Sequence, residues 1–167
     1  PKKNIFREHP KEDEMASRSI FKDKDDITYF TNDPAWSEYP GPLCYCGKRG
    51  CLERWVSGTG LKRDYFYVTG EERSTHEIIA NAQKGEKKAV AAFDRYTDRL
   101  ARAYAFVINI LDPDVIVVGG GMSSVEKIYE DVPEIWGKYI YAQSPKTKLL
   151  PARHGDSSGI RGAAWLS

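Results

Sequence analysis

Apolar residues recur at helical spacing along residues 86–111, the longest patterned stretch of the chain. The positions that would form one face are Val90, Phe93, Leu100, Tyr104, Val107, Ile108 and Leu111. Spacings of three, four and seven residues place side chains on one side of an α-helix. The sequence D-P-D at residues 112–114 should end the helix, because proline cannot continue it and the preceding residue avoids helical angles. We therefore predict one long amphipathic helix over residues 86–111.

After this helix, the chain alternates between short apolar runs and helical patterns. Residues 115–118 (V-I-V-V) are β-branched throughout and predict a buried parallel strand, and residues 147–152 suggest a second strand. Helices are predicted over residues 124–139, with Pro133 as a kink or break, and over residues 156–166. The last helix should pack through its apolar residues Ile160, Ala163, Ala164 and Leu166. Strand, glycine loop and helix in repeated order predict an α/β fold.

Before the long helix, the pattern predicts three shorter helices. Residues 52–56 have a helical apolar face, and the glycines of residues 58–60 (G-T-G) should break this helix. A short helix over residues 61–66 should follow. Ser74 and Glu77 have the spacing of a capping box, which predicts a third helix starting there.

Composition narrows the class of protein without naming a function. The chain has 167 residues and 41% hydrophobic residues, as a single soluble domain has, and 25 Lys and Arg balance 24 Asp and Glu. Such balance favours neither nucleic acid nor an anionic membrane. With no apolar stretch of membrane-spanning length and no signal peptide, we expect a cytoplasmic protein. Residues 1–38 are expected to be a charged arm or a segment that resembles no known family, and a start at Pro1 is consistent with a fragment.

All three cysteines of the chain, Cys44, Cys46 and Cys51, fall within eight residues. Clustered thiols beside glycines that let the backbone turn sharply are typical of a single tetrahedral metal site. A disulfide fits less well, because the number of cysteines is odd and Cys44 and Cys46 are too close in sequence to bridge easily. Incidental thiols in a loop are the other alternative. Thiolate ligands favour zinc, which needs a fourth ligand, normally a histidine.

Three stretches of the sequence resemble one family. Residues 44–53 read C-Y-C-G-K-R-G-C-L-E, which resembles the C-x-C-G-x-x-G-C-x-E signature of the ROK family of repressors, open reading frames and sugar kinases. Residues 109–123 and 154–165 resemble later family motifs in the expected order, most closely in the bacterial fructokinase branch. The resemblance covers residues 39–167. It implies an α/β fold that forms the C-terminal lobe of an actin-like or hexokinase-like ATPase, with a zinc-binding loop.

The resemblance also implies an ATP-dependent kinase that transfers the γ-phosphate to a hexose, with fructose as the expected sugar. Glu53 matches the family glutamate that accepts hydrogen bonds from sugar hydroxyls, although a carboxylate there could simply favour the helix dipole. Gly119, Gly120, Gly121 and Met122 match the segment that borders the adenosine of ATP. A glycine turn without a ligand is the alternative for these four residues.

The family histidine that completes the zinc site has no match in this chain. ROK kinases supply it from a G-H-N-P segment before the cysteines, where residues 30–34 read F-T-N-D-P. The three histidines are His9, His76 and His154, and His76 lies inside the capping box as an expected surface residue. We rank His9 first as the fourth ligand, ahead of a water molecule or Asp33.

Motifs that phosphoryl transfer requires are absent from the sequence. The family places a D-x-G-x-T phosphate loop, an Asn-Asp base and a G-T-G loop in its amino-terminal half, so no residue here is assigned as catalytic. ATP and Mg²⁺ would bind the complete kinase, and this chain alone should be inactive. The alternatives are a non-catalytic fragment and the sugar-responsive domain of a ROK-type regulator, although residues 1–38 show no helix-turn-helix. An apolar face left by the missing half should favour a homo-oligomer.

Overall fold

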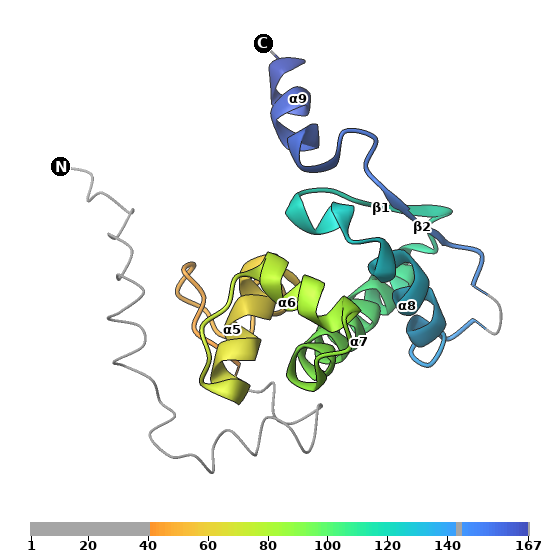
Figure 1. Ribbon diagram of the computed structural model, residues 1–167. Helices are drawn as coiled ribbons and strands as arrows, with labels where there is room; N and C mark the ends of the chain where they lie inside the picture. The colour runs from red at the N-terminus through yellow and green to blue at the C-terminus, as the bar shows by residue number, and fades with distance from the viewer. Residues whose placement is uncertain (1–40, 143–144, 167) are drawn as a thin grey trace. The chain divides into compact units, whose positions relative to one another are not determined.

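The computed structural model describes residues 41–142 and 145–166, and it divides the chain into two units, Pro1–Cys51 and Leu52–Ser167 (Figure 1). In the first unit, the described residues form a tight loop. An isolated antiparallel bridge joins Leu43 to Arg49, and the Cys44 N–H donates to the Lys48 carbonyl at 2.7 Å. These contacts fold the cysteine segment back on itself.

The second unit is mostly helical. Its helices are α4 (Glu53–Val56), α5 (Gly58–Thr69), α6 (Thr75–Gln83), α7 (Lys87–Leu111), α8 (Glu126–Trp136) and α9 (Ser158–Ala164). Two 3-10 turns, η1 (Gly121–Ser124) and η2 (Gly155–Ser157), follow its two strands. Among the described residues, no helix is both long and apolar enough to cross a bilayer.

The helix ends follow the signals in the sequence. The Ser74 hydroxyl accepts the Glu77 N–H at 3.2 Å, and the Glu77 carboxylate accepts the Ser74 N–H at 2.7 Å, which confirms the predicted capping box. Helix α7 spans nearly the whole predicted range. Asp112 follows it in the left-handed conformation (φ 43°), just before the proline that stops the helix.

The predicted helix break at residues 58–60 was wrong by one residue. Ser57 is the break, and the glycines form the first turn of α5. The reason is local capping, because the Ser57 hydroxyl accepts the Gly60 N–H at 3.0 Å.

Strands β1 (Val115–Val118) and β2 (Lys148–Pro151) pair in parallel along their whole length and form the sheet of the described residues. Both strands were predicted, and α8 lies between them in sequence as the crossover that parallel strands need. Val118 and Leu149 are buried, whereas Val117 is 60% exposed. The prediction of a buried strand was therefore wrong for one face, which no described residue covers.

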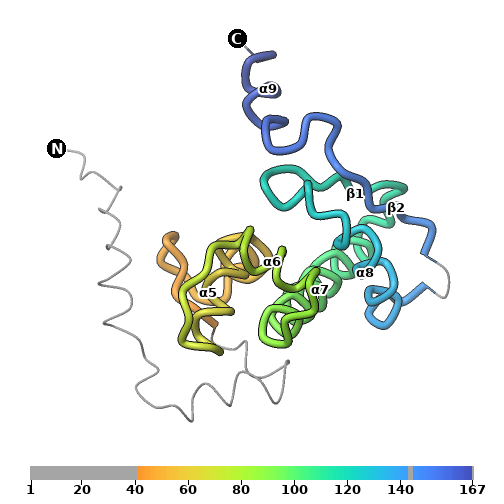
Figure 2. Tube along the Cα trace, in the orientation of Figure 1, coloured from red at the N-terminus to blue at the C-terminus, as the bar shows by residue number. Residues whose placement is uncertain are grey.

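The apolar core gathers among α5, α6, α7 and α8, which we call the helical block (Figure 2). Helix α7 contacts the other three helices of the block. The largest members of the core are Leu61, Tyr65, Ile78, Phe93, Tyr96, Leu100, Ile108, Ile128, Val132 and Trp136. Of the face predicted for α7, Phe93, Leu100 and Ile108 are buried, while Val107 and Leu111 lie on the surface.

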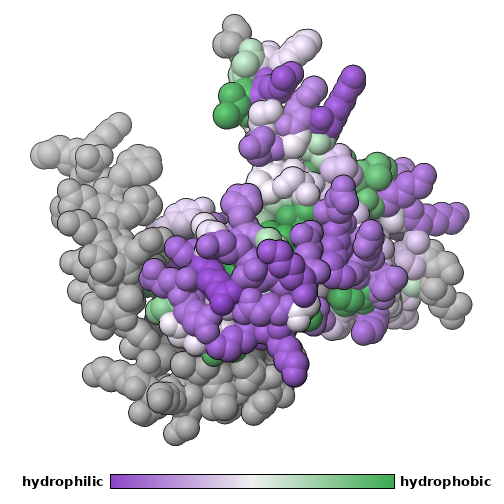
Figure 3. Space-filling view, viewed as in Figure 1, coloured by the Kyte–Doolittle hydropathy of each residue, from purple (hydrophilic) through white to green (hydrophobic). Residues whose placement is uncertain are grey.

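The terminal helix α9 forms where it was predicted but does not pack as predicted. Ile160 is 77% exposed and Leu166 is 92% exposed, and α9 has no buried residue. The apolar side chains of α9 therefore have no cover among the described residues. Figure 3 shows this exposed apolar surface on α9 and near the strands.

Candidate functional site

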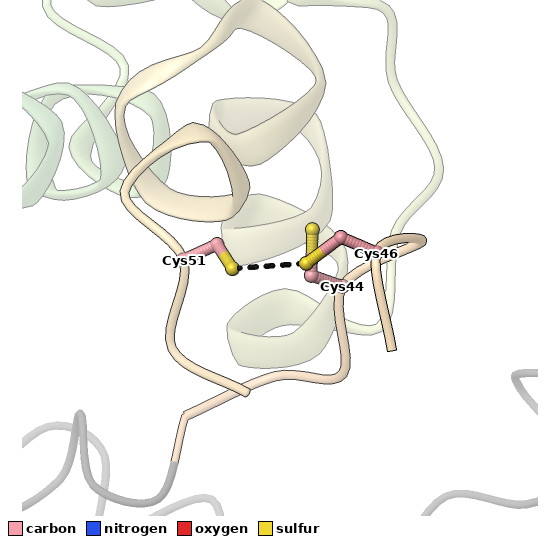
Figure 4. Close-up of side chains that lie close together, drawn as sticks. All are labelled: Cys44, Cys46 and Cys51. Atoms are coloured by element: carbon pink, nitrogen blue, oxygen red, sulfur yellow. Dashed lines mark hydrogen bonds between the residues drawn. The ribbon is translucent and has the colours of Figure 1, made fainter. Parts of the chain in front are cut away.

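The three cysteines converge because the loop turns sharply at two glycines. Gly47 and Gly50 have φ angles of 83° and 68°, a conformation that side chains other than glycine rarely adopt. The three Sγ atoms all lie within 4.8 Å of one another, and those of Cys46 and Cys51 are 3.4 Å apart (Figure 4). Cys44 is buried and Cys46 is exposed, so the cluster is reachable from solvent.

These distances fit a tetrahedral zinc ion. With a Zn–S bond of about 2.3 Å, sulfur ligands lie about 3.8 Å apart, which is within the range of the cluster. The cysteines therefore could supply three of the four ligands of a metal ion. The predicted fourth ligand, His9, and its alternative Asp33 lie outside the described residues.

Cys46 and Cys51 affect each other's protonation. The backbone N–H of Lys48 and the Cys51 thiol donate hydrogen bonds that lower the pKa of Cys46. Hydrogen bonds to the sulfurs of Cys46 and Cys44 raise the pKa of Cys51 to about 11. Ionisation of the Cys46 thiol therefore disfavours ionisation of the Cys51 thiol, since two adjacent thiolates repel each other. A divalent cation reverses this preference, because a coordinated thiol is deprotonated.

Glu53 is the first residue of α4 and is exposed. Its place in the first helical turn agrees with both interpretations of its carboxylate, as a hexose ligand or as a partner of the helix dipole. The side chain of Trp55, in the same short helix, packs against Arg99 of α7 at 4.5 Å from the guanidinium carbon to the ring centroid. One face of this indole is therefore occupied by a cation rather than open to a sugar ring.

A buried ion cluster beside α4 was missed by the sequence reasoning. Asp64 accepts hydrogen bonds from Arg99 at 2.6 Å and from Arg95 at 2.6 and 3.0 Å. The side chains of Asp64 and Arg99 are only 5% and 7% exposed. Arg95 and Arg99 are four residues apart on α7, so they share one face of the helix, and that spacing was the available signal.

The predicted nucleotide turn lies at the carboxyl edge of the sheet. Because β1 and β2 are parallel, their carboxyl ends meet at one edge, and η1 and η2 follow there in mutual contact. Ligands of open α/β sheets bind at this edge. A Cβ atom built on Gly119, Gly120 or Gly121 would meet no described atom within 4 Å. The three glycines therefore leave their backbone accessible.

Met122 differs from the glycines beside it. Its side chain is partly buried and packs against the core. A Cβ on Gly58, at the start of α5, would lie 3.3 Å from the Met122 sulfur, so the glycine makes room for this methionine. Met122 thus links the turn to the helical block, and the backbone of Gly119–Gly121 remains the exposed part.

The structure brings the three thiols together but places the other predicted residues on separate elements. Glu53 lies on α4, and the glycine turn leads into η1. His76 is exposed, as predicted, and His154 is exposed immediately before η2.

Comparison with known sequences identifies the family. The ROK family matches residues 33–167. An N-acetyl-D-glucosamine kinase of Vibrio atlanticus is 42% identical over 124 residues, which are 74% of this chain and 41% of that protein. The same kinase of Yersinia enterocolitica is 37% identical over 130 residues, 78% of this chain and 43% of that protein. The chain thus spans less than half the length of these relatives.

Solved structures agree with the sequence match. A ROK family glucokinase from Streptomyces griseus, in complex with glucose and AMPPNP, superposes with a TM-score of 0.68 at 26% identity, over 76% of this chain and 47% of that one. A ROK hexokinase from Thermus thermophilus gives 0.64 at 31% identity, over 76% and 43%. A ROK family transcriptional regulator, a homolog of the E. coli MLC protein, gives 0.53 at 28% identity, over 66% and 31%. The chain belongs to the ROK family and has the α/β fold of its carboxyl-terminal, actin-like ATPase lobe.

Proposed function

We propose that this chain is the carboxyl-terminal lobe of an ATP-dependent hexose kinase, which transfers the γ-phosphate of ATP to a sugar hydroxyl. The observation that carries the proposal is the family match over residues 33–167, together with relatives that are N-acetyl-D-glucosamine kinases. Since the chain spans 41% of the Vibrio atlanticus relative, the complete enzyme would need residues beyond this lobe.

Each predicted residue has a physical task in this proposal. Glu53 would accept hydrogen bonds from hexose hydroxyls, because an ionised carboxylate is an acceptor that can orient two donors. Gly119–Gly121 would let the adenosine side of ATP approach the backbone. Zinc bound by the cysteines would cross-link the loop that directly precedes Glu53 in sequence. Mg²⁺, the base and the phosphate loops would act in the complete kinase, outside the motifs of this chain.

The relatives favour an aldohexose as the substrate. Those reported above phosphorylate N-acetyl-D-glucosamine or, for the Streptomyces griseus enzyme, were solved with glucose. We therefore propose N-acetyl-D-glucosamine as the first hexose to test. Fructose, which the motif resemblance suggested, is the competing substrate.

Phosphorylation assays with ATP and N-acetyl-D-glucosamine, glucose or fructose test the proposal. They should be run on this chain and on a longer polypeptide that adds the other lobe. We expect hexose-dependent ADP release from the longer protein, lost in Glu53→Gln, and none from this chain. A missing base alone removes about 10²–10⁴-fold in rate. No turnover of any hexose by the longer protein would overturn the proposal, and turnover by this chain would assign catalytic groups to residues 1–38.

Gly121→Val tests the nucleotide turn in the same longer protein. Because a Cβ at Gly121 meets no described atom within 4 Å and its φ is not left-handed, the fold should tolerate valine. We expect ATP affinity to fall about tenfold through steric exclusion, a difference near 1.4 kcal/mol. Gly137→Val, at the end of α8, is the control. An unchanged affinity for ATP would assign the glycines to turn geometry alone.

A sugar-responsive regulatory domain is the second candidate. The observation that favours it is the structural similarity to the ROK family transcriptional regulator. Hexose binding without ATP binding in the longer protein would support this candidate over the kinase.

For either function, we place the protein in the cytoplasm, where thiols stay reduced and available to a metal. We also propose a homo-oligomer formed through the exposed apolar residues.

A further inference from the structure

Helix α4 is too short to hold itself in place. It has four residues, no side-chain hydrogen bond at its cap and no buried residue. Isolated helices shorter than about 12–15 residues are marginal in water, so tertiary contacts must fix α4. Since Glu53 is its first residue, those contacts also determine where the Glu53 carboxylate lies.

Two contacts tie α4 to α7. The Arg99 guanidinium carbon lies 4.5 Å from the centroid of the Trp55 ring, which is a cation–π contact. Arg99 is only 7% exposed, so solvent and salt screen this attraction weakly. Three residues earlier on α7, the Tyr96 hydroxyl donates to the Val56 carbonyl at 3.2 Å.

Asp64 on α5 fixes the orientation of Arg99. Its Oδ1 accepts from Arg99 Nη1 at 2.6 Å, and its Oδ2 accepts from Arg95. A carboxylate that is 5% exposed needs such partners, because an unpaired buried charge is costly. The planar guanidinium, held by this carboxylate, therefore presents a fixed face to the indole.

Helix α5 also contacts the α4 backbone directly. A Cβ on Gly60 would lie 2.8 Å from the Arg54 carbonyl oxygen and 2.9 Å from that of Trp55, so only glycine permits this approach. Arg63 donates a hydrogen bond to the same Arg54 carbonyl. Helix α4 is therefore held by both α5 and α7.

The geometry of α4 couples Trp55 to Glu53. At 3.6 residues per turn, side chains two positions apart, such as those of Glu53 and Trp55, point about 200° apart, which agrees with a half-buried Trp55 and an exposed Glu53. A rotation of α4 that releases the indole would swing the carboxylate. We propose that Arg99 is a positioning residue that, through Trp55, fixes the direction of Glu53. The role rests on the proposed function, in which Glu53 binds the hexose.

Spectroscopy on the full chain tests this role. The chain has four tryptophans, so the protein is labelled with 5-fluorotryptophan and the Trp55 resonance is assigned with Trp55→Phe. Hydrogen exchange is followed at the Trp55 and Val56 amides, which both donate to the Leu52 carbonyl at 2.9 Å. Arg99→Met should shift the Trp55 resonance and speed the exchange of both amides about tenfold through local opening. Arg99→Lys, which keeps the cation, should restore part of the protection.

Arg95→Met is the matched control, because it removes the other partner of Asp64 and leaves the Arg99 contact with Trp55. It should leave the Trp55 resonance in place and change the exchange rates of the Trp55 and Val56 amides by no more than about twofold. Unchanged α4 exchange in a folded Arg99→Met protein would overturn the proposal. If Arg99→Met also loses exchange protection in α6, the block itself has opened. The Trp55 resonance and the α4 exchange of Arg99→Lys then decide the proposal.

A titration with N-acetyl-D-glucosamine separates this proposal from the proposed function. If the Glu53 amide of the longer polypeptide does not respond to the sugar, the hexose role of Glu53 fails, while the exchange data still decide the role of Arg99. If it responds, Arg99→Met should weaken the affinity for the sugar about tenfold, and Arg95→Met should not.

Discussion

The helical block and the two-stranded sheet bury their apolar residues to very different degrees. In the block, Ile78, Ile128 and Val132 are completely buried, whereas Val117 and Leu150 of the sheet are 60% and 45% exposed. Helices satisfy their backbone hydrogen bonds internally, so four of them can cover one another. A parallel sheet needs cover on both faces, and the described residues supply it on one. The block is therefore fully covered by the described residues, and the sheet is covered by them on one face only.

The largest effect should come from opening the block. Ile108→Ala, at a residue that is 3% exposed, should lower the free energy of unfolding by about 2–5 kcal/mol, through lost burial and the cavity left behind. Ile110→Ala makes the same change two residues along α7 at a position that is 63% exposed, and it should cost no more than about 0.5 kcal/mol. Urea unfolding of both variants measures the difference. Equal losses would show that the exposed face of α7 is covered in solution.

A substitution on the exposed face of the sheet should change self-association rather than the free energy of unfolding. Val117→Lys places a charge on the uncovered face, so we expect self-association to weaken about tenfold, with unfolding changed by no more than about 0.5 kcal/mol. Glu130→Lys on the exposed side of α8 is the control for added charge. Sedimentation over a range of concentrations gives both results. Self-association that persists unchanged in Val117→Lys would place the contact on another surface.

Metal removal should leave the block almost untouched. We expect one zinc per chain, bound by Cys44, Cys46 and Cys51, and a lower zinc content in Cys46→Ser. Chelation should speed exchange in the cysteine loop but change the unfolding of the helical block by less than about 1 kcal/mol, since the core residues lie outside the loop. Metal analysis with exchange measurements checks both parts. A zinc-free protein with three freely titrating thiols would contradict the metal site.

The smallest effect concerns pH and the surface of the block. Hydrogen bonds from Lys88 and Tyr65 hold the pKa of Glu71 below its usual value. The stability that this carboxylate contributes is therefore present above its ordinary pKa and is lost as the pH falls through the lowered value. Glu71→Gln should flatten the acid side of the stability profile, measured by urea unfolding at several pH values. Glu72→Gln, at an exposed neighbour, should not.

Much of the fold was predictable because its signals are local. The period of α7, the Ser74 cap and the β-branched run of β1 depend on neighbours in sequence, and all three are confirmed. The burial of α9 and of β1 was not predictable in this way. An apolar residue indicates that its side chain favours burial, but whether it is buried depends on which other segments pack against it.

In the candidate site, too, the features that depend on sequence neighbours were predictable and those that depend on distant residues were not. Cys44, Cys46 and Cys51 were found because a short loop concentrates its ligands in sequence. The contact of Arg99 with Asp64 joins residues 35 apart, and a single charge on a helix is more often solvated than paired. Only the folded arrangement of α5 against α7 shows that these two charges meet.

The order of the helices has a consequence for how the chain acquires its structure. Helices α5, α6, α7 and α8 each pack against the next one in sequence, so most contacts between helices of the block join sequence neighbours. Proteins dominated by such local contacts fold in about microseconds to milliseconds. All four helices precede β2 in the chain, so they can begin to assemble during synthesis before the second strand has left the ribosome.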